Sequence, residues 1–338
     1  MYFQSAQLPV RRLGRTDLDI TRVGLGTWAI GGPWAFGWGP QDDGESQAAI
    51  RRAVALGINW IDTAAVYGLG HSEEIVGRTV RALAPSERPY LFTKCGLVWD
   101  ERDRTIEPRR VLRPDTIRRE CEASLRRLGV ERIDLYQFHW PDESGVAVED
   151  SWAAMLALVD EGKIRWPGVC NFDVARLERC QVLGPVASLQ PPFSAVRRKF
   201  AAAELPWCRG NGVGTIVYSP MQSGLLTERF SAERLAGLPA DDYRHRGTEF
   251  QEPRLARNLA LRDAMRPVAA RHHTSVGELA IAWTLAWPGV TAAIVGARSA
   301  AQVDGWIGAA RLQLAREDLD EIADAIARTG AGEGPAEP

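Results

Sequence analysis

Four polar side chains of this sequence, Asp62, Tyr67, Lys94 and His139, are of the types that reduction of a carbonyl group requires. A carbonyl carbon that receives a hydride also needs a proton on its oxygen, and a tyrosine phenol can donate one. The pKa of an unperturbed tyrosine is about 10, and a lysine ammonium within about 4–6 Å lowers it. We therefore expect Lys94 to lower the pKa of Tyr67 and Asp62 to fix Lys94. His139 would donate to the carbonyl oxygen and orient it.

The elements that could bring these residues together are the strands of a barrel. Short runs rich in β-branched and aromatic residues alternate with stretches of helical periodicity along most of the sequence. Strands are predicted at residues 23–27, 60–64, 90–94, 133–139, 165–171, 187–190, 215–219 and 292–296. Helices are predicted at residues 45–56, 73–83, 114–128, 148–161, 174–183, 201–210, 255–287 (as two helices), 302–310 and 317–327.

Eight strands that alternate with helices imply a parallel sheet that closes on itself. The predicted fold class is therefore α/β, a (β/α)8 TIM barrel, with an N-terminal β-hairpin whose turn is formed by residues 14–17. The carboxyl ends of the strands of such a barrel meet at one face, where these barrels carry out their chemistry. Because Asp62, Lys94 and His139 come at such ends and Tyr67 follows closely, we expect the four side chains to converge.

One barrel domain is predicted, over residues 6–329. Residues 1–5 have neither a basic segment nor an apolar core and are interpreted as the remnant of a cleaved tag, not as a signal peptide. Residues 330–338 have the composition of a flexible tail. Segments 28–44 and 222–253 are predicted as long loops, and loops of that length in a compact domain are usually functional or disordered.

The composition argues against several classes of protein. A formal net charge of −2 gives no reason to expect nucleic acid or a membrane surface as a partner. No run of about 18 apolar residues is present, so no membrane span is predicted. Five cysteines without a C-x-x-C pair argue against disulfides and a zinc site and favour a reducing, cytoplasmic setting. No metal site is predicted, and the oligomeric state is left open.

Six short motifs together resemble the aldo-keto reductase family, from about residue 13 to residue 326. They are Trp60-Ile-Asp-Thr-Ala-Ala-Val-Tyr67, Leu91-Phe-Thr-Lys94, Asp134-Leu-Tyr-Gln-Phe-His139, Gly168-Val-Cys-Asn171, Gly26-Thr-Trp28 and Gly70-x-Ser-Glu-Glu74. The resemblance implies that Asp62, Tyr67, Lys94 and His139 are the catalytic residues of a nicotinamide-dependent enzyme.

The cofactor that the resemblance implies is NADPH (NADP+), with NADH as an alternative. The sequence has no G-x-G-x-x-G motif, so a Rossmann dinucleotide domain is not supported. The resemblance implies an extended cofactor across the carboxyl-terminal face of the barrel. The residues expected to contact it are Gly26, Thr27, Trp28, Asp62, Cys170, Asn171, Gln190, Tyr218, Ser219, Pro220, Met221, Gln222, Ser223, Gly224, Leu225, Gly296, Ala297, Arg298, Ser299, Gln302 and Trp306.

The same resemblance implies individual roles at the nicotinamide end of the cofactor. Cys170, Asn171 and Gln190 would meet the carboxamide, because side-chain amides can both donate to it and accept from it. Tyr218 would stack on the nicotinamide ring. The loop 219–225 would cover the pyrophosphate.

The resemblance also implies that Arg298 binds the adenosine phosphate. Arg298 follows the last predicted strand at a helix start, where barrel enzymes often bind phosphate. Asp304 stands six positions later, where relatives often have a second basic residue. A carboxylate there would repel a 2′-phosphate, so the choice between NADPH and NADH stays open.

The substrate is expected to be a small carbonyl or alcohol compound in an apolar pocket above the nicotinamide. The sequence contains 12 tryptophans, and several fall in loops that follow predicted strands. The residues expected to line the pocket are Trp28, Trp34, Trp38, Tyr67, Trp99, His139, Trp140 and Phe193.

The favoured function is an NADPH-dependent reductase that turns an aldehyde or ketone into an alcohol, with Tyr67 as the general acid. An NAD(P)-dependent sugar or polyol dehydrogenase is the alternative of the same family. A nicotinamide-binding regulatory subunit with slow turnover is an alternative of another class, since potassium-channel β subunits also resemble this family. A barrel lyase or isomerase is less favoured, because it would need phosphate or metal groups that the sequence does not show.

Overall fold

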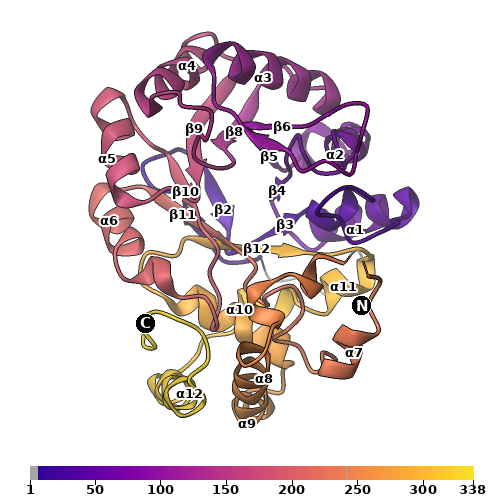
Figure 1. Cartoon of the computed structure of the whole chain (residues 1–338), viewed down its shortest axis with the longest axis vertical. Coiled ribbons are helices and arrows are strands. Elements are labelled where there is room, and N and C mark those ends of the chain that lie inside the picture. Colours follow the sequence, from indigo (N-terminus) through magenta and orange to yellow (C-terminus); the bar gives the residue numbers. More distant parts are fainter. Residues whose placement is uncertain (1–6, 241) are drawn as a thin grey trace.

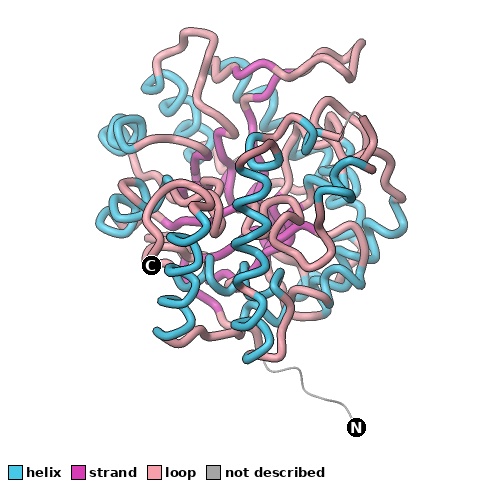
Figure 2. Tube along the Cα trace, turned by 60° about the horizontal axis from the view of Figure 1, so that its bottom comes forward, coloured by secondary structure: helices cyan, strands magenta, loops and turns pink. Residues whose placement is uncertain are grey.

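The protein is a closed barrel of eight parallel strands with helices around it, as the computed structural model shows (Figure 1). The structure describes residues 7–240 and 242–338, so the supposed tag remnant at residues 1–5 lies outside the described residues. The strands follow one another around the barrel in the order β10-β11-β12-β3-β4-β5-β8-β9. Figure 2 shows the strands enclosed by helices from another side. The predicted TIM barrel with its N-terminal hairpin is confirmed.

Each barrel strand coincides with a predicted range to within a few residues. The strands are β3 (Val23–Gly26), β4 (Trp60–Asp62), β5 (Tyr90–Cys95), β8 (Ile133–Phe138), β9 (Ile164–Cys170), β10 (Ser188–Gln190), β11 (Gly214–Tyr218) and β12 (Ala292–Gly296). Their register sets which side chains are neighbours. Lys94 of β5 pairs with Gln137 of β8, and Gln137 pairs with Gly168 of β9.

The helices follow the predicted alternation. They are α1 (Asp43–Ala55), α2 (His71–Arg81), α3 (Pro114–Leu128), α4 (Val148–Asp160), α5 (Val174–Leu183), α6 (Glu204–Asn211), α7 (Ala232–Ala236), α8 (Arg254–Ala264), α9 (Arg266–Arg271), α10 (Val276–Ala286), α11 (Ala300–Asp304) and α12 (Arg316–Thr329). Their ends have recognisable causes. In α10, Ser275 and Glu278 form a reciprocal capping box, and α3 starts with a proline and ends at a left-handed Gly129.

Some local predictions were wrong. The range 255–287 contains three helices instead of two, because Pro267 opens α9 and the left-handed His273 (φ 51°) separates α9 from α10. The loop after β5 contains an unpredicted hairpin of β6 (Leu97–Val98) and β7 (Arg109–Arg110). Its strands are too short to leave a periodic pattern in the sequence.

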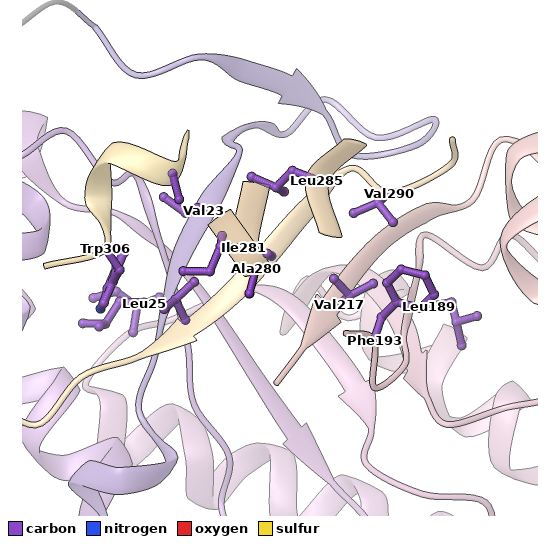
Figure 3. Packing of buried hydrophobic residues seen from close by; sticks show 14 of the residues in the cluster. Val23, Leu25, Leu189, Phe193, Val217, Ala280, Ile281, Leu285, Val290 and Trp306 are labelled. Carbon is purple, nitrogen blue, oxygen red and sulfur yellow. The ribbon is translucent and has the colours of Figure 1, made fainter. Parts of the chain in front are cut away.

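Two hydrophobic cores hold the fold together. The N-terminal hairpin of β1 (Val10–Arg12) and β2 (Asp19–Thr21) brings Leu13, Leu18 and Ile20 into the inner core, together with barrel-interior residues such as Trp60. The hairpin thereby closes the amino-terminal end of the barrel and leaves the carboxyl-terminal end for the site. The larger core lies between strands and helices, and Figure 3 shows part of it.

Residues 330–338 pack against the barrel and do not form the predicted flexible tail. Ala331 is buried, and the backbone N–H of Arg198 donates to the carbonyl of Glu333 at 2.9 Å. The buried guanidinium of Arg198 also donates to the carbonyl of Ala331 at 3.2 Å. Glu333 forms an ion pair with Arg254 at 2.6 Å. The composition of residues 330–338 could not indicate this packing. The segment is held by its backbone carbonyls, which accept hydrogen bonds from the buried guanidinium of Arg198.

Among the residues that the structure describes, no helix is long and apolar enough to cross a bilayer.

Candidate active site

Lys94 lies at the centre of the predicted catalytic cluster. Its Nζ donates to Oδ1 of Asp62 at 2.5 Å, to the carbonyl of Thr63 at 2.9 Å and to the hydroxyl of Tyr67 at 3.3 Å. Lys94 and Asp62 are 1% and 2% exposed, so water screens their interaction little. Because an ammonium has three donors, these contacts fix Lys94 beside the Tyr67 hydroxyl.

The electrostatic balance at Tyr67 differs from the prediction. Burial raises the pKa of Tyr67 to about 12, and the nearby Lys94 ammonium offsets only part of this rise. Burial removes hydration from the Lys94 ammonium and lowers its pKa, but Asp62, Tyr67 and Cys170 together raise the pKa by more, so that it lies above its ordinary value. Lys94 lowers the pKa of Tyr67 as expected, but desolvation of the phenolate is the larger effect, so the pKa lies above its ordinary value. Tyr67 is a neutral phenol, and Lys94 is a cation, at neutral pH.

His139 completes the group of four. Its ring centroid lies 5.6 Å from that of Tyr67, with the two planes at 76°. Burial, followed by the charges of Lys94 and Arg110, holds the pKa of His139 well below its ordinary value. The imidazole is therefore neutral at neutral pH and keeps one N–H donor. The structure thus brings all four predicted side chains together.

Tyr67 is positioned by a close crossing of two loops. The loop after β4 carries Tyr67, and its backbone N–H donates to the carbonyl of Ala64 at 3.1 Å. Gly68 has a φ of 62°, and a Cβ there would lie 1.9 Å from the carbonyl oxygen of Gly31. Only glycine can therefore let the loop after β3 pass over the loop that holds Tyr67.

A cluster of buried hydroxyl groups connects the same two loops. The Ser72 hydroxyl lies 2.9 Å from that of Thr27 and 3.0 Å from that of Thr63. Thr27 in turn donates to the carbonyl of Asp62 at 3.1 Å. Thr27, predicted as a cofactor residue, is fully buried and contributes here to the support of β4.

The residues predicted at the nicotinamide end lie at the carboxyl ends of β9, β10 and β11. Asn171 has a left-handed φ of 62°, its Nδ2 donates to the carbonyl of His139 at 2.9 Å, and its Oδ1 accepts from the Tyr218 hydroxyl at 2.9 Å. Gln190 Nε2 donates to Oδ2 of Asp62 at 2.9 Å. Gln190 and Tyr218 are thereby linked to the group of four through Asp62 and His139.

Cys170 is the last residue of β9, directly before Asn171. Its side chain is buried, and burial raises the pKa of the thiol, so the sulfur is uncharged at neutral pH. Its Sγ lies 3.9 Å from Oε1 of Gln137, a weak donor contact.

The loop after β11 has an unusual backbone. Ser219, Gln222 and Ser223 have φ values of 59°, 46° and 55°, followed by Gly224 at 90°. Left-handed conformations of non-glycine residues cost free energy and concentrate at ligand-binding loops. Of the other residues predicted there, Pro220 and Leu225 are buried and Met221 is half-buried. The backbone strain supports a binding role for the loop.

The predicted phosphate corner follows β12. Arg298 is half-buried, its Nε donates to Oε1 of Gln41 at 2.6 Å, and its backbone N–H donates to Oε1 of Gln302 at 2.8 Å. Asp304 forms an ion pair with Arg52 of α1 at 2.7 Å. The carboxylate that could repel a phosphate is therefore balanced by a second cation. Of the other residues predicted at this corner, Gly296 is exposed, Ala297 is buried and Ser299 is half-buried.

Two predicted site residues lie in the outer core. Trp306 is 3% exposed and lies beside Leu25 in the outer core (Figure 3). Phe193 is fully buried and stacks on Trp283 at 6.1 Å, with planes 9° apart. Phe193 follows β10 and Trp306 follows α11, and both rings pack into the outer core.

Aromatic rings from the two long loops contact one another, and one of them contacts Tyr67. Trp28 lies edge-on to Trp38 at 5.0 Å and to Tyr243 at 5.2 Å, and the ring of Trp34 lies 6.4 Å from that of Tyr67. Trp34 thus contacts Tyr67, and Trp28, Trp38 and Tyr243 form an aromatic cluster that joins the two long loops.

The other two predicted pocket tryptophans are less tightly connected to that group. Trp140 packs under the Arg110 guanidinium, 4.3 Å from its ring centroid. Trp99 is half-buried in the loop after β5 and makes no ring contact with the described residues.

Three residues of this region were missed by sequence reasoning. Gln137 lies on β8, two positions after the barrel-interior residue Leu135, so the period of a strand could have placed it inside the barrel. Gln41 and Tyr243 come from the long loops and carried no comparable signal. Within residues 7–240 and 242–338, no group of His, Cys, Asp and Glu could hold a metal ion.

A TIM barrel with a tyrosine, lysine, aspartate and histidine at its carboxyl-terminal face has the architecture of a nicotinamide-dependent oxidoreductase. A model of the aldo/keto reductase family matches residues 22–327, and the chain belongs to that family. It is an oxidoreductase that acts on carbonyl or alcohol groups, and the family uses NAD(P)H.

Similar proteins span nearly the full length of this chain. Aldo-keto reductase YhdN of Bacillus subtilis (strain 168) is 36% identical over 308 residues, which cover 91% of this chain and 90% of the relative. The NADH-specific methylglyoxal reductase of Escherichia coli (strain K12) is 34% identical over 329 residues, covering 94% and 98%. The structure of the glycerol dehydrogenase AKR11B4 from Gluconobacter oxydans matches with a TM-score of 0.87 and 37% identity, covering 96% and 97%.

Proposed function

We propose that this enzyme is an NADPH-dependent reductase that converts an aldehyde or a ketone into an alcohol, with Tyr67 as the general acid. The observation that carries this proposal is the contact of Lys94 Nζ with both Asp62 and the Tyr67 hydroxyl. The contact holds the Lys94 ammonium beside the phenol oxygen of Tyr67, which is the atom that loses its proton in the reaction. A bound reduced nicotinamide would supply the hydride.

Each of the four residues has a defined task in this proposal. Tyr67 gives its hydroxyl proton to the carbonyl oxygen as that oxygen becomes an alcohol. Lys94 stabilises the phenolate that remains, and Asp62 holds the ammonium in place. His139, as a neutral imidazole, donates a hydrogen bond to the carbonyl oxygen and orients it.

The residues at the strand ends fit a nicotinamide cofactor. Gln190 uses its NH₂ group on protein acceptors, and its Oε1 accepts no hydrogen bond from any described residue. That oxygen is an acceptor for a carboxamide NH₂. Cys170 and Asn171 flank the same position, Tyr218 offers a ring, and the strained loop 219–225 would hold the pyrophosphate.

The preference for NADPH rests on Arg298. Its guanidinium is the cation at the corner after β12, and the Asp304 carboxylate nearby is paired with Arg52. A relative that is 34% identical is NADH-specific by name, so NADH is the competing cofactor. The five cysteines are free and buried, which supports a reducing, cytoplasmic setting.

A polyol dehydrogenase is the second candidate, because a structure 37% identical to this chain is that of a glycerol dehydrogenase. Oxidation of an alcohol requires Tyr67 as a phenolate base, and burial raises its pKa to about 12. Alcohol oxidation at this site should therefore be fastest at alkaline pH. The complete group of four argues against a regulatory subunit with slow turnover.

A spectrophotometric screen of cofactor oxidation tests the proposal. NADPH and NADH would each be offered with short aldehydes, α-dicarbonyls, cyclic ketones and oxidised sugars, with Tyr67→Phe as the matched control. We expect turnover that needs Tyr67 and is faster with NADPH. Turnover only with alcohols and NAD+ would overturn the reductase in favour of the dehydrogenase.

A further inference from the structure

We propose that Gln137 is a positioning residue of the nicotinamide site: it fixes the side-chain amide of Gln190 so that the carbonyl oxygen of that amide is offered to the cofactor. The inference deepens the proposed function and rests on it. Gln137 lies on β8 inside the barrel and is fully buried. Its role would be exerted through Gln190.

The starting point is the carboxylate of Asp62. An ionised carboxylate only accepts hydrogen bonds, so the group of Gln190 that faces Oδ2 of Asp62, at 2.9 Å, has to be the NH₂ group. The second N–H of the same group reaches Oε1 of Gln137 at 3.3 Å. Both donors of the Gln190 amide are therefore used by the protein.

The oxygen of Gln190 is left for a ligand. Rotating the amide by half a turn would place Oε1 of Gln190 against two acceptors, Asp62 Oδ2 and Gln137 Oε1, which is repulsive. Asp62 and Gln137 together thus exclude that rotamer. Asp62 alone would hold only one of the two N–H groups.

Gln137 is held in turn by donors that converge on its oxygen. Besides Gln190, the hydroxyl of Ser188 lies 3.4 Å from Oε1 of Gln137, and Sγ of Cys170 lies 3.9 Å from it. The Nε2 atom of Gln137 is buried and has no hydrogen-bond partner within the described part of the chain. An unpartnered buried donor costs stability, so an apolar side chain would serve the core better. Gln137 therefore supplies an acceptor oxygen that an apolar side chain at this position would lack.

The barrel leaves room for this contact at one glycine. Gly168 of β9 lies between Gln137 on β8 and Ser188 on β10 in the strand register. A Cβ at position 168 would lie 2.3 Å from the Ser188 hydroxyl oxygen and 3.1 Å from Cγ of Gln137. The missing side chain on the middle strand therefore lets Gln137 reach across to β10.

Calorimetric titration with two ligands tests the role. NADP+ contains the carboxamide, and 2′-phosphoadenosine diphosphate ribose is the same molecule without nicotinamide. We expect Gln137→Met to weaken NADP+ binding by roughly fivefold or more, and to leave binding of the ribose fragment within about twofold of the wild type. Tyr136→Phe is the matched control, since it changes the preceding residue of β8, whose side chain faces the outer core, and it should alter neither affinity.

Gly168→Ala is a second variant. It keeps Gln137 but places a methyl group in the space that the Gln137 side chain occupies between β8 and β10. It should show the same loss for NADP+ and not for the fragment, and it keeps the inference testable if Gln137→Met does not fold. Equal weakening of both ligands, or no change in either, would overturn the role of Gln137 while leaving the proposed function intact. A wild-type protein that binds neither ligand would overturn the NADPH assignment, and this inference with it.

Discussion

The guanidinium Nε of Arg298 donates to Oε1 of Gln41 at 2.6 Å, although 257 positions separate the two residues. The contact is reciprocal, since Nε2 of Gln41 donates to the backbone carbonyl of Arg298 at 2.9 Å. It joins the long loop after β3 to the corner after β12. The loop that carries Trp34 and Trp38 is therefore linked to the residue proposed to select the cofactor.

Arg298→Ala should raise the KM for NADPH severalfold or more and leave the KM for NADH nearly unchanged. A charge-assisted hydrogen bond to phosphate is worth about 1.5–3 kcal/mol, and a half-buried site should lie low in that range. Steady-state kinetics with both cofactors provide the measurement. Gln41→Ala is the control for the loop contact, because it removes that contact and keeps the cation. Equal use of both cofactors by the wild type, unchanged in Arg298→Ala, would disprove the phosphate assignment.

Tyr67→Phe should lower turnover by roughly 10²–10⁴-fold, the range for loss of a general acid. Cofactor binding should change little, because the ring and its packing remain. The comparison requires kcat under conditions where chemistry limits the rate, and the dissociation constant of NADP+ from titration. Wild-type turnover in the variant would show that another group supplies the proton.

Reduction and oxidation should depend on pH in opposite ways. Burial raises the pKa of Tyr67 to about 12, so the protonated form needed for reduction dominates below that pH. Reduction should be nearly flat from about pH 6 to 10, whereas oxidation of the product alcohol should rise steadily over the same range. Lys94→Met removes the cation that lowers the tyrosine pKa and should depress oxidation further. A plateau of oxidation near neutral pH would contradict the raised pKa.

Glu120 should make the fold less stable as pH rises. Burial raises its pKa from an ordinary 4.5 to about 7, although the Gly96 N–H that donates to Oε2 at 3.0 Å opposes the shift. The folded state then binds more protons than the unfolded state between these values, so the stability contribution is present below about pH 4.5 and is lost as pH rises to about 7.

Glu120→Gln keeps an acceptor for Gly96 and carries no charge. It should therefore increase the free energy of unfolding above pH 7 by an amount on the order of 1–3 kcal/mol, and have little effect near pH 4.5. Urea titrations at several pH values measure both. A gain that is the same at all pH values would point to packing, not to titration.

A chain that ends at Thr329 should be less stable than the full chain by about 2–4 kcal/mol. Its truncation would leave the buried Arg198 guanidinium without the tail carbonyls that accept from it. A chain that ends at Pro335 keeps these acceptors and is the control. Thermal unfolding of the three proteins provides the comparison, and identical melting temperatures would mean that the tail contributes nothing.

The sequence by itself determined the barrel and its four central side chains. Alternation of strand and helix patterns located all eight barrel strands, and the polar residues at the ends of 60–64, 90–94 and 133–139 had to meet at one face, because parallel strands share a direction. These inferences depend only on local periodicity and on one rule of topology.

Tertiary structure decided the rest, because it depends on contacts between segments that no local pattern relates. The sign of the pKa shift of Tyr67 follows from the competition of burial with Lys94, and the depth of burial is known only once the loops are in place. The same holds for the turn of Phe193 and Trp306 into the outer core. Gln137 shows the limit most clearly: its strand and face could be inferred, but its reach to Gln190 depends on Gly168 of a third strand.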